Sequence, residues 1–466
     1  MRKKIVLRCA LCSIAFFILI GANICPAGEH GMEVIENIDV SLTPRQENYP
    51  SVSYNPINEE FMVLWNTSGK RIDHPEDTIS YHSVHGQRVS PEGELLSDVF
   101  TLSPLEAPSW KTLPKSAHNI FTNEYGVVFS KGPGFWGGSL YKTIIDDLGN
   151  IKNPSVDPSP IYPTLYNASH PLIIFNSTDQ EYLAVCNDKF VFDPADPNIK
   201  NVAYILDRDG MPVKGPIRVD GPDAIGIEFN PQGVYNEEEG NYFLAWEDYR
   251  HVQSMWQTTE IYGVLLDREG DLINEVPLID DFALPNNGRD QRVEFVAYNS
   301  DRNEYLVVWA AGYVQGPPSL NGYISGRIFG PDGMPRGPEI IMAQTGNPST
   351  PSVVYVPKVK EYLMVWNDSR EDPTPGPGWG KSNDIWARWL KKDGRPKFKE
   401  IPICIKEGNQ TYPQVAYDSA NHRFAIIWAD HNAPDDSDVI PGGGPMATEM
   451  PGDIRGVIYG EIEPEE

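Results

Sequence analysis

The chain has 466 residues, and its 65 acidic against 38 basic residues give a formal net charge of −27 at pH 7. Binding to nucleic acid or to an anionic lipid surface depends on Lys and Arg side chains that neutralise phosphate, so this composition excludes both as the main function. A chain of this length buries enough apolar surface to fold without disulfide bonds.

The first 27 residues are typical of a secretory signal peptide. Basic residues between Arg2 and Arg8 precede an apolar run from Ile14 to Ile20, and Cys25-Pro26-Ala27 offers a cleavage site. The apolar run is short for a membrane span, so we expect none. We expect cleavage near Ala27 and a mature protein that is secreted, periplasmic or held at the cell surface. Lipid modification of Cys25 stays open as an alternative.

A repeat organises the rest of the chain. An aromatic residue precedes a tryptophan by eleven residues in five places. These are Tyr54 to Trp65, Tyr235 to Trp246, Tyr298 to Trp309, Tyr355 to Trp366 and Tyr417 to Trp428. A sixth copy runs from Phe175 to Cys186, and a weaker one from Phe121 to Phe129 has a shorter turn. The tryptophan position recurs at intervals of 57 to 64 residues, which indicates a repeat architecture.

Each repeat predicts four β-strands. The first follows a Pro-x-Val-x-Tyr pattern such as Pro50 to Tyr54, and the second is an apolar run that ends in Trp, such as Tyr305 to Trp309. A continuous apolar run suits a strand that is buried on both faces. The third strand follows a long loop, and a hairpin such as Asp332-Gly333 leads to the fourth.

Seven such repeats, each unable to bury its faces alone, predict an all-β fold: a seven-bladed β-propeller of four-stranded antiparallel blades. We expect one domain over residues 28–466, with blades that start near residues 50, 117, 170, 230, 292, 350 and 412. The last repeat stops after its third strand, and an unassigned strand pattern lies within residues 32–43. We expect this N-terminal strand to pair antiparallel with residues 455–462 and to complete the last blade.

The units resemble those of secreted bacterial β-propeller proteins that carry Tyr-Leu-Val-x-Trp-x-Asp-x-Arg followed by Asp-Ile-x-Gly. The nearest copy is Tyr362 to Arg370 with Asp384-Ile385, and the second is Phe243 to Arg250 with Glu260-Ile261. The resemblance spans about residues 50 to 462. It implies the propeller fold and names no activity, since such proteins are mostly uncharacterised.

Two cysteines, Cys186 and Cys404, remain after the signal is removed. They belong to different repeats and to different strands within them, so we expect both to be unbridged. We expect Cys186 to be buried in the slot that other repeats give to tryptophan.

The long loops between second and third strands emerge on one face, so we expect a site there or at the mouth of the central channel. Asp188, Asp248, Asp368 and Asp430 follow the Trp position by two residues, and Arg250 and Arg370 follow it by four. Recurrence in phase with the repeat favours structural loop pairs, Asp248 with Arg250 and Asp368 with Arg370. A ring of carboxylates for cations or acid–base chemistry is the alternative.

Three tryptophans fall outside the repeat pattern. Trp136 and Trp379 lie on loops rich in Gly and Pro, and Trp256 lies in another long loop. Exposed aromatic rings on such loops stack on sugars or anchor a protein partner. The alternative is that they fold down and cap a blade. Asp430 and His431, in the last long loop, join them as candidate ligand-binding residues.

No cofactor is predicted. The nine His residues have no zinc-binding spacing, and the sequence has no phosphate loop or nucleophile elbow. The acidic run Asp435 to Asp438 resembles a calcium loop in composition but lacks the spacing of an EF-hand. Bound Ca²⁺ therefore stays open as an alternative.

These observations lean towards a protein without catalytic activity. The leading hypothesis is a secreted propeller that binds a glycan or a protein partner through its long-loop face. A carbohydrate-active enzyme similar to a glycoside hydrolase, with carboxylates at the channel mouth, is the first alternative. A structural subunit of an extracellular or envelope assembly is the second, because propellers serve all three purposes.

Overall fold

The structure is a computed structural model. It describes residues 31–43, 45–69, 81–106, 110–134, 137–155, 157–161, 168–188, 200–220, 228–249, 260–279, 290–313, 322–370, 383–431 and 452–461. Every named element in this part of the chain is a β-strand, so the fold is all-β as predicted. The described residues contain no helix long and apolar enough to cross a membrane.

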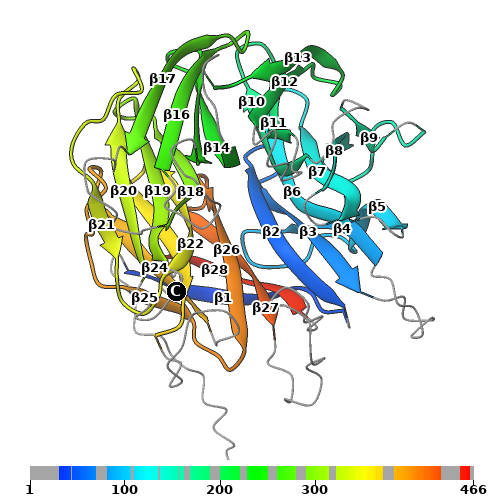
Figure 1. The fold of residues 1–466 in the computed structure, drawn as a ribbon. Helices are drawn as coiled ribbons and strands as arrows, with labels where there is room; N and C mark the ends of the chain where they lie inside the picture. The colour runs from blue at the N-terminus through cyan, green and yellow to red at the C-terminus, as the bar shows by residue number, and fades with distance from the viewer. Residues whose placement is uncertain are drawn as a thin grey trace, which may run out of the picture.

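The strands form units of four that follow one another in chain order (Figure 1). The first unit comprises β2 (Gln46–Asn55), β3 (Glu60–Gly69), β4 (Tyr81–Val89) and β5 (Phe100–Glu106). The second comprises β6 (Trp110–Asn119), β7 (Glu124–Gly134), β8 (Gly137–Asp146) and β9 (Ser159–Pro160). The third comprises β10 (Ser169–Asn176), β11 (Glu181–Asp188), β12 (Lys200–Leu206) and β13 (Pro212–Arg218).

The later units repeat this arrangement. The fourth comprises β14 (Glu228–Asn236), β15 (Asn241–Asp248), β16 (Glu260–Asp267) and β17 (Leu272–Ile279). The fifth comprises β18 (Asp290–Asn299), β19 (Glu304–Tyr313), β20 (Tyr323–Phe329) and β21 (Ile340–Ala343). The sixth comprises β22 (Ser349–Val356), β23 (Glu361–Asp368), β24 (Asp384–Leu390) and β25 (Ile401–Cys404).

The last unit combines the two ends of the described chain. It comprises β26 (Asn409–Asp418), β27 (Arg423–His431), β28 (Gly452–Glu461) and β1 (Met32–Ser41). The predicted antiparallel pairing of the N-terminal strand is present, and its register runs from Met32 opposite Glu461 to Ser41 opposite Ile454. One parallel bridge, Gln46 to Gly452, joins this unit to the first. In Figure 1, β1 and β2 in blue accordingly lie beside β28 in red.

The apolar core lies in layers between neighbouring units. Second strands such as β3, β15 and β23 are buried on both faces because their side chains face a unit on each side. The layer between the last unit and the first contains Trp65 and Ile427, and β1 adds Ile38 and Val40 to it. The first strand of each unit also packs against the first strand of the next, and β26 packs against β2.

The turns between first and second strands carry polar contacts that join neighbouring units. Asn236 opens the first turn of the fourth unit, and its Nδ2 donates a hydrogen bond to the Tyr305 hydroxyl of the fifth unit at 2.7 Å. Asn299 makes the same bond to Tyr362 of the sixth unit at 3.0 Å. Asn suits this position because its short side chain accepts hydrogen bonds from the amides of its own turn and donates one to the neighbouring unit.

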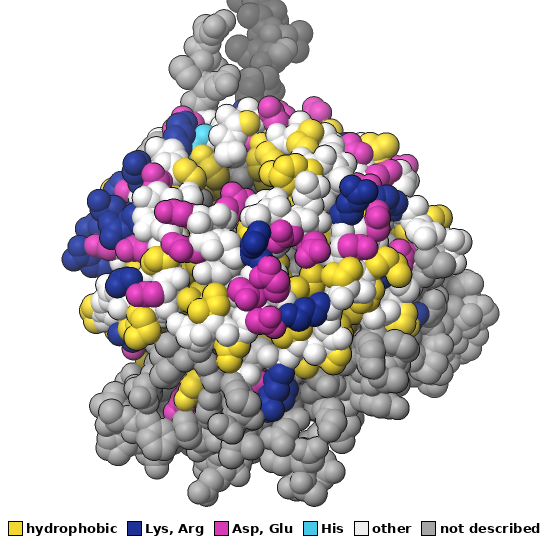
Figure 2. Space-filling view, turned by 90° about the horizontal axis from the view of Figure 1, so that it is seen from above, with side chains coloured by type: hydrophobic (Ala, Val, Ile, Leu, Met, Phe, Trp, Pro, Cys, Tyr) yellow, Lys and Arg dark blue, Asp and Glu magenta, His cyan; other side chains and the backbone are white. Residues whose placement is uncertain are grey.

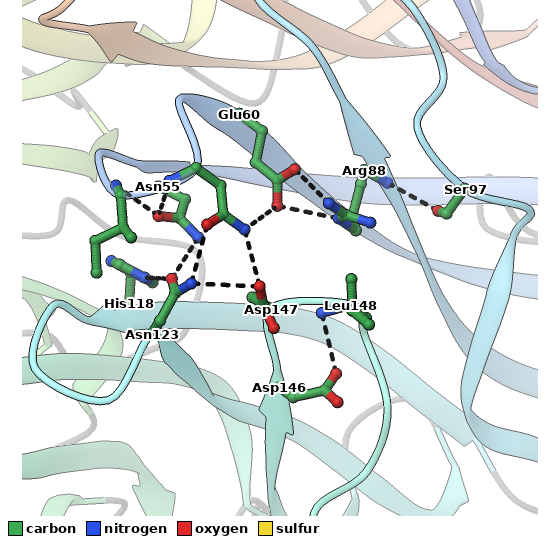
Figure 3. A network of polar contacts seen from close by, with 11 residues as sticks. Asn55, Glu60, Arg88, Ser97, His118, Asn123, Asp146, Asp147 and Leu148 are labelled. Atoms are coloured by element: carbon green, nitrogen blue, oxygen red, sulfur yellow. Dashed lines mark hydrogen bonds and ion pairs between the residues drawn. The ribbon is translucent and has the colours of Figure 1, made fainter.

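The first and second units share a larger polar network at these turns (Figure 3). Asn123 accepts a hydrogen bond from Asn55 at 2.8 Å and donates to Asp147 at 3.3 Å. Within the first unit, Arg88 binds both carboxylate oxygens of Glu60, at 3.0 and 2.6 Å. The donors and acceptors satisfy one another, so we interpret this network as a structural contact between units.

The structure also corrects one detail of the repeat. The turn of the second unit is as long as the others, because His118 lies opposite Tyr125 just as Tyr54 lies opposite Phe61. The aromatic position is therefore His118 and not Phe121, and the usual eleven-residue step leads from it to Phe129.

The prediction for the cysteines is confirmed. Cys186 forms no disulfide and has no exposed surface, and it packs in the apolar layer between the second and third units. Cys404 is also free and buried, and burial raises the pKa of its thiol to about 12.

Candidate functional site

Several residues singled out in the sequence lie outside the described part of the chain. They are Trp136, Trp256, Trp379, Arg250 and the acidic run 435–438. Within the described residues, no group of three or more His, Cys, Asp and Glu side chains is placed to hold a metal ion.

The repeated aspartates support the loops around them. The indole nitrogen of Trp246 donates to Asp248 at 3.0 Å, and that of Trp366 donates to Asp368 at 2.9 Å. Arg370 pairs with Asp368 at 2.5 Å, and its guanidinium lies 3.7 Å from the centre of the Trp386 ring. Because Asp368 has no exposed surface, this geometry favours the structural role that the sequence suggested, and that role stays a prediction.

A bulge recurs near the start of the first strands. In six units the residue before a proline has a φ between 46° and 57°. These residues are Tyr49, Leu113, His170, Asn230, Thr350 and Tyr412. The left-handed conformation costs residues other than glycine about 1–2 kcal/mol, and a bulge turns a side chain away from the regular pleat. The backbone is therefore repeated, while the side chain that it presents differs from unit to unit.

Two of these residues meet where the last unit adjoins the first. The rings of Tyr49 on β2 and Tyr412 on β26 lie 4.7 Å apart, with 51° between their planes. Both side chains are half-buried. Burial, and next the Tyr412 phenol, raise the pKa of Tyr49 well above its ordinary value.

Glu47 lies two residues before Tyr49 and is only 1% exposed. Its Oε1 accepts hydrogen bonds from the hydroxyls of Ser41 at 2.8 Å and Thr43 at 3.0 Å. The Trp65 side chain is a further hydrogen-bond partner of this carboxyl group. Burial raises the pKa of Glu47 to about 7, and the charge of Asp453 adds to the effect, while the hydrogen bonds from Ser41, Thr43 and Trp65 oppose it. Glu47 is thus an acid that holds its proton up to neutral pH.

An arginine organises the carboxylates on the opposite face of the last unit, which is turned to the sixth unit. Asp430, Asp453 and Arg455 are in phase with Trp428 and Val457 of that layer, and the charges of Asp430 and Arg455 act on the Cys404 thiol. Arg455 Nε lies 3.3 Å from Asp430 Oδ2, and its NH2 lies 3.1 Å from Asp453 Oδ2. Asp430 also accepts a hydrogen bond from Gln410 at 3.0 Å and is 2% exposed. Asp453 is more open, with 14% of its side chain exposed.

His431 completes the junction and is held in place by packing. It lies opposite Gly452, where an added Cβ would come within 2.5 Å of its Nδ1. Burial lowers the pKa of His431, although the charge of Asp430 opposes this, so the imidazole is neutral at pH 7. Of the two predicted residues, His431 lies with Glu47 around Gly452, whereas Asp430 lies on the other face of β27 with Gln410 and Arg455. We call the residues on the two faces of the last unit at this end the junction site: Glu47, Tyr49, Tyr412, Asp430, His431, Asp453 and Arg455.

A second buried acid, Glu228 at the start of β14, has different surroundings. Lys200 Nζ lies 3.0 Å from its Oε1 and 3.0 Å from Asp220 Oδ2, and the backbone amide of Asn201 donates to its Oε2 at 2.9 Å. Burial, and next the charge of Asp220, raise the pKa of Glu228. Both of its oxygens have partners, so this cluster is complete without a ligand.

The surface charge does not single out another site. On the face that Figure 2 shows, acidic side chains are spread over the surface with basic and apolar ones among them. The buried polar groups are therefore more informative than the net charge.

Sequence reasoning missed Glu47, Asp453 and Arg455. One signal for Glu47 is available in the sequence: it precedes the proline of its repeat by three residues. A side chain at this position of the first strand faces the neighbouring unit. Nothing in the sequence alone brings β1, β2 and β28 together at the side chain of Glu47.

Comparison with known proteins gives structural likeness only. No protein-family model matches the chain. No curated protein matches it either. Among solved structures, a protein of unknown function from Dyadobacter fermentans has a TM-score of 0.49 at 13% identity, over 92% of this chain and 99% of that one. An α-L-arabinanase from Penicillium chrysogenum, in complex with arabinobiose, has a TM-score of 0.45 at 12% identity, over 91% and 98%. A GH93 α-L-arabinofuranosidase from Fusarium graminearum has a TM-score of 0.44 at 11% identity, over 92% and 98%.

These findings correct the leading functional hypothesis. None of the similar structures is named as a non-catalytic binding protein, the leading hypothesis, whereas three are named as glycoside hydrolases, which is the first alternative. Others are named as an N-acetylgalactosamine deacetylase and a puromycin hydrolase. With TM-scores below 0.5, the likeness carries no argument about mechanism or substrate. The chemistry has to be argued from the residues of this chain.

Proposed function

We propose that this protein is an exported carbohydrate-active enzyme built on a seven-bladed β-propeller, and that the junction site hydrolyses a glycosidic bond. The signal-like segment at residues 1–27 supports export. The contacts between successive first strands, which run on from β26 to β2, support a ring of seven blades. The pairing of β1 with β28 supports closure of that ring by the N-terminal strand.

The observation that carries the activity is the unequal pair of carboxyl groups. Glu47 is buried and holds its proton to about pH 7, whereas Asp453 is partly exposed and paired with Arg455. Two carboxyl groups whose surroundings differ in this way serve as an acid and a charged carboxylate in glycoside hydrolysis. The environment of each group therefore assigns its role.

In the proposed reaction, Glu47 donates its proton to the glycosidic oxygen as the bond between that oxygen and the anomeric carbon breaks. The carboxylate of Asp453 stabilises the positive charge that develops on the sugar ring. Water adds to the anomeric carbon, and the proton it releases restores Glu47. Arg455 orients Asp453 and links it to Asp430.

The test is hydrolysis of a panel of polysaccharides, measured by the release of reducing sugar. Glu47→Gln keeps the size of the side chain and removes the acid, so we expect the rate to fall at least about 100-fold, the usual contribution of general acid catalysis. Glu228→Gln is the matched control, because Glu228 is equally buried and belongs to no part of the junction site. We expect that variant to keep wild-type turnover.

Two results would overturn the proposal. One is a folded Glu47→Gln variant that cleaves as fast as the wild type. The other is a folded wild-type protein that releases no sugar from any glycan in the panel. The pH profile adds a further check, since activity should decline as the pH rises through about 7 and Glu47 loses its proton.

A further inference from the structure

A row of polar side chains runs from Glu47 across the face of the first unit that is turned to the last unit. Thr67 on β3 lies directly opposite Glu47, and Ser83 on β4 lies directly opposite Thr67. Directly opposite residues of neighbouring strands share a face, and their Cβ atoms are about 4.5–5.5 Å apart. Trp65 precedes Thr67 by two residues and packs against the last unit, so the row faces that unit too.

His85 continues the row on β4. Its Nε2 lies 2.7 Å from the Ser83 hydroxyl, and its Nδ1 lies 3.1 Å from the Thr101 hydroxyl. Trp65 contacts both parts of the row: its side chain is a hydrogen-bond partner of Glu47, and its ring centre lies 5.9 Å from that of His85. The buried carboxyl group and the imidazole therefore border the same indole.

Exposure rises along this row. Glu47, Thr67 and Ser83 are buried. His85 is half-buried, and Thr101 is exposed. The row thus leads from a buried acid to the protein surface.

Every group between Glu47 and the surface can both donate and accept a hydrogen bond. Hydroxyls do so by rotating, and a neutral imidazole has one donor and one acceptor nitrogen. An imidazole also titrates near neutral pH, which suits it to pass protons on. A row of such groups can carry a proton in either direction.

Thr67 is where the first unit departs from the repeat. An aspartate stands at its position in the fourth, sixth and last units, as Asp248, Asp368 and Asp430. In the fourth and sixth units that aspartate accepts a hydrogen bond from the indole of its own unit.

In the first unit Glu47 is the partner of the indole, and a hydroxyl takes the place of the aspartate. The Thr67 Oγ1 is buried and has no hydrogen-bond partner among the described residues. Buried hydroxyls are almost always paired, and a turn about χ1 or one bound water joins Thr67 to its neighbours across the strands.

We propose that Thr67, Ser83 and His85 form a proton relay between the surface and Glu47. This inference rests on the proposed function, and it supplies the route by which the proton that water releases returns to Glu47 through solvent.

In the relay, a proton from solvent reaches Nδ1 of His85 past the exposed Thr101, and Nε2 gives its own proton to the Ser83 oxygen. Ser83 gives its hydroxyl proton to Thr67, and Thr67 gives its own to the Glu47 carboxylate. One proton enters the row and one arrives at Glu47, so each group keeps its charge. Rotation of the hydroxyls and exchange of the imidazole proton with solvent reset the row.

Two other titratable groups act near Glu47. His431 lies with it around Gly452, and the charge of Asp453 contributes to its pKa. Because His431 belongs to the last unit, it offers a different entry for protons, and the experiment has to separate it from His85.

A pH jump followed by infrared detection tests the relay without any substrate. The jump runs from about pH 6 to about pH 8, on either side of the Glu47 pKa of about 7. The C=O stretch of a protonated carboxyl group reports the proton, and Glu47→Gln identifies the band of Glu47 by removing it. The variants of the row are Thr67→Val, Ser83→Ala and His85→Ala, and His431→Gln tests the other entry.

The matched controls are Thr143→Val and Ser130→Ala. Both remove a buried hydroxyl from the second unit, away from the row. We expect each variant of the row to slow the loss of the Glu47 band about tenfold or more, as expected when a positioned proton-transfer group is removed. The controls and His431→Gln should keep the wild-type rate. Free imidazole should restore the rate of His85→Ala, because it replaces the missing ring, whereas an equal concentration of sodium chloride should not.

The outcomes separate this inference from the proposed function. If the folded row variants lose the band as fast as the wild type, the relay is wrong and the hydrolase proposal stands. If only His431→Gln slows the loss, protons enter from the last unit and the relay is also wrong. A slow His85→Ala that imidazole does not restore would show that the ring serves packing. If the row variants are slow and the wild type cleaves no glycan, the relay stands and the proposed function falls. A wild type without the Glu47 band at pH 6 would overturn both.

Discussion

At the scale of single residues, Glu47 and Glu228 show how surroundings separate a structural acid from a functional one. Burial raises both pKa values. Glu228 has the Lys200 ammonium group and the amide of Asn201 on its two oxygens, whereas the hydrogen-bond donors at Glu47 are neutral: the hydroxyls of Ser41 and Thr43 and the Trp65 side chain. A buried carboxyl group with neutral donors keeps its proton more readily than one that pairs with an ammonium group. This difference suits Glu47 to the role of an acid.

The raised pKa of Glu47 predicts a pH dependence of stability. The folded pKa of about 7 lies above the ordinary value of 4.5, so the folded state holds the proton more tightly than the unfolded state does. The contribution of Glu47 is complete below pH 4.5 and is lost as the pH rises through 7. The expected loss is at most about 3 kcal/mol, since one pKa unit corresponds to about 1.4 kcal/mol.

Urea denaturation at several pH values measures this effect. Glu47→Gln has no proton to lose at this position, so its free energy of unfolding should lack that decline. The difference between wild type and variant should therefore change in favour of the variant between pH 5 and pH 8. A difference that is the same at every pH would show that Glu47 titrates normally.

Asp368 provides the opposite case, a carboxylate whose role is to hold a loop. Asp368→Ala removes the acceptor of the Trp366 indole and of Arg370, so the free energy of unfolding should fall by about 1–3 kcal/mol. Asp393→Ala is the control, because that carboxylate pairs with Arg395 on an exposed hairpin and should matter little. Hydrolysis at low temperature should survive both changes. Lost activity at an unchanged melting temperature would move Asp368 into a site.

At the scale of strands and turns, two positions that contact each other across neighbouring units change together from one pair of units to the next. The fourth and fifth units have Asn236 and Asn299 facing a tyrosine of the following unit. The sixth unit has Val356 at the Asn position, and the unit after it has Phe424 at the tyrosine position. Both are fully buried in one apolar cluster. The polar pair and the apolar pair are two solutions to the same contact.

This alternation predicts a coupling that a double-mutant cycle can measure. Asn299→Val leaves the buried Tyr362 hydroxyl without its partner and should lower the free energy of unfolding by about 1–3 kcal/mol. Adding Tyr362→Phe removes the orphaned hydroxyl, so the double variant should recover most of that loss. Additive effects of the two changes would mean that the hydrogen bond between them contributes nothing.

The sequence predicts strands and turns well where their signals are local. Apolar runs ending in Trp identify β15, β19 and β23, and the Asp-Gly hairpins identify the turns after β20 and β24, without any tertiary information. The second unit shows the limit. His118 fills a position that is otherwise Tyr or Phe, so the aromatic pattern of the sequence points to Phe121 and to a shorter turn. The bulges before proline were also missed, because a positive φ at Tyr or Thr has no signature in composition.

At the scale of the whole molecule, the junction between the last and first units differs from every other junction between units in the described chain. It alone joins the two ends of the described chain, and there β1 extends the sheet of β26, β27 and β28. Ser41 and Thr43, at and just after the end of that strand, are the residues that bond Glu47. The repeat spacing could predict the pairing of the ends, whereas the site depends on side chains brought together from distant segments. Those contacts leave no periodic trace in the sequence.

If the N-terminal strand holds the molecule together and shapes the site, damage to it should affect both. Ile38 is 2% exposed and packs in the apolar layer between the last and first units. Ile38→Asp places an unpaired charge in that layer, so the free energy of unfolding should fall by about 4 kcal/mol or more. Asn37→Asp is the matched control, because Asn37 is the exposed neighbour on the same strand.

Urea denaturation and hydrogen exchange measure the two variants. Exchange should rise first in β1 and β28 of Ile38→Asp, and hydrolysis should fall with it because Glu47 loses Ser41 and Thr43. An Ile38→Asp variant with normal stability and activity would show that the ring holds without β1, and the proposed closure would then be wrong.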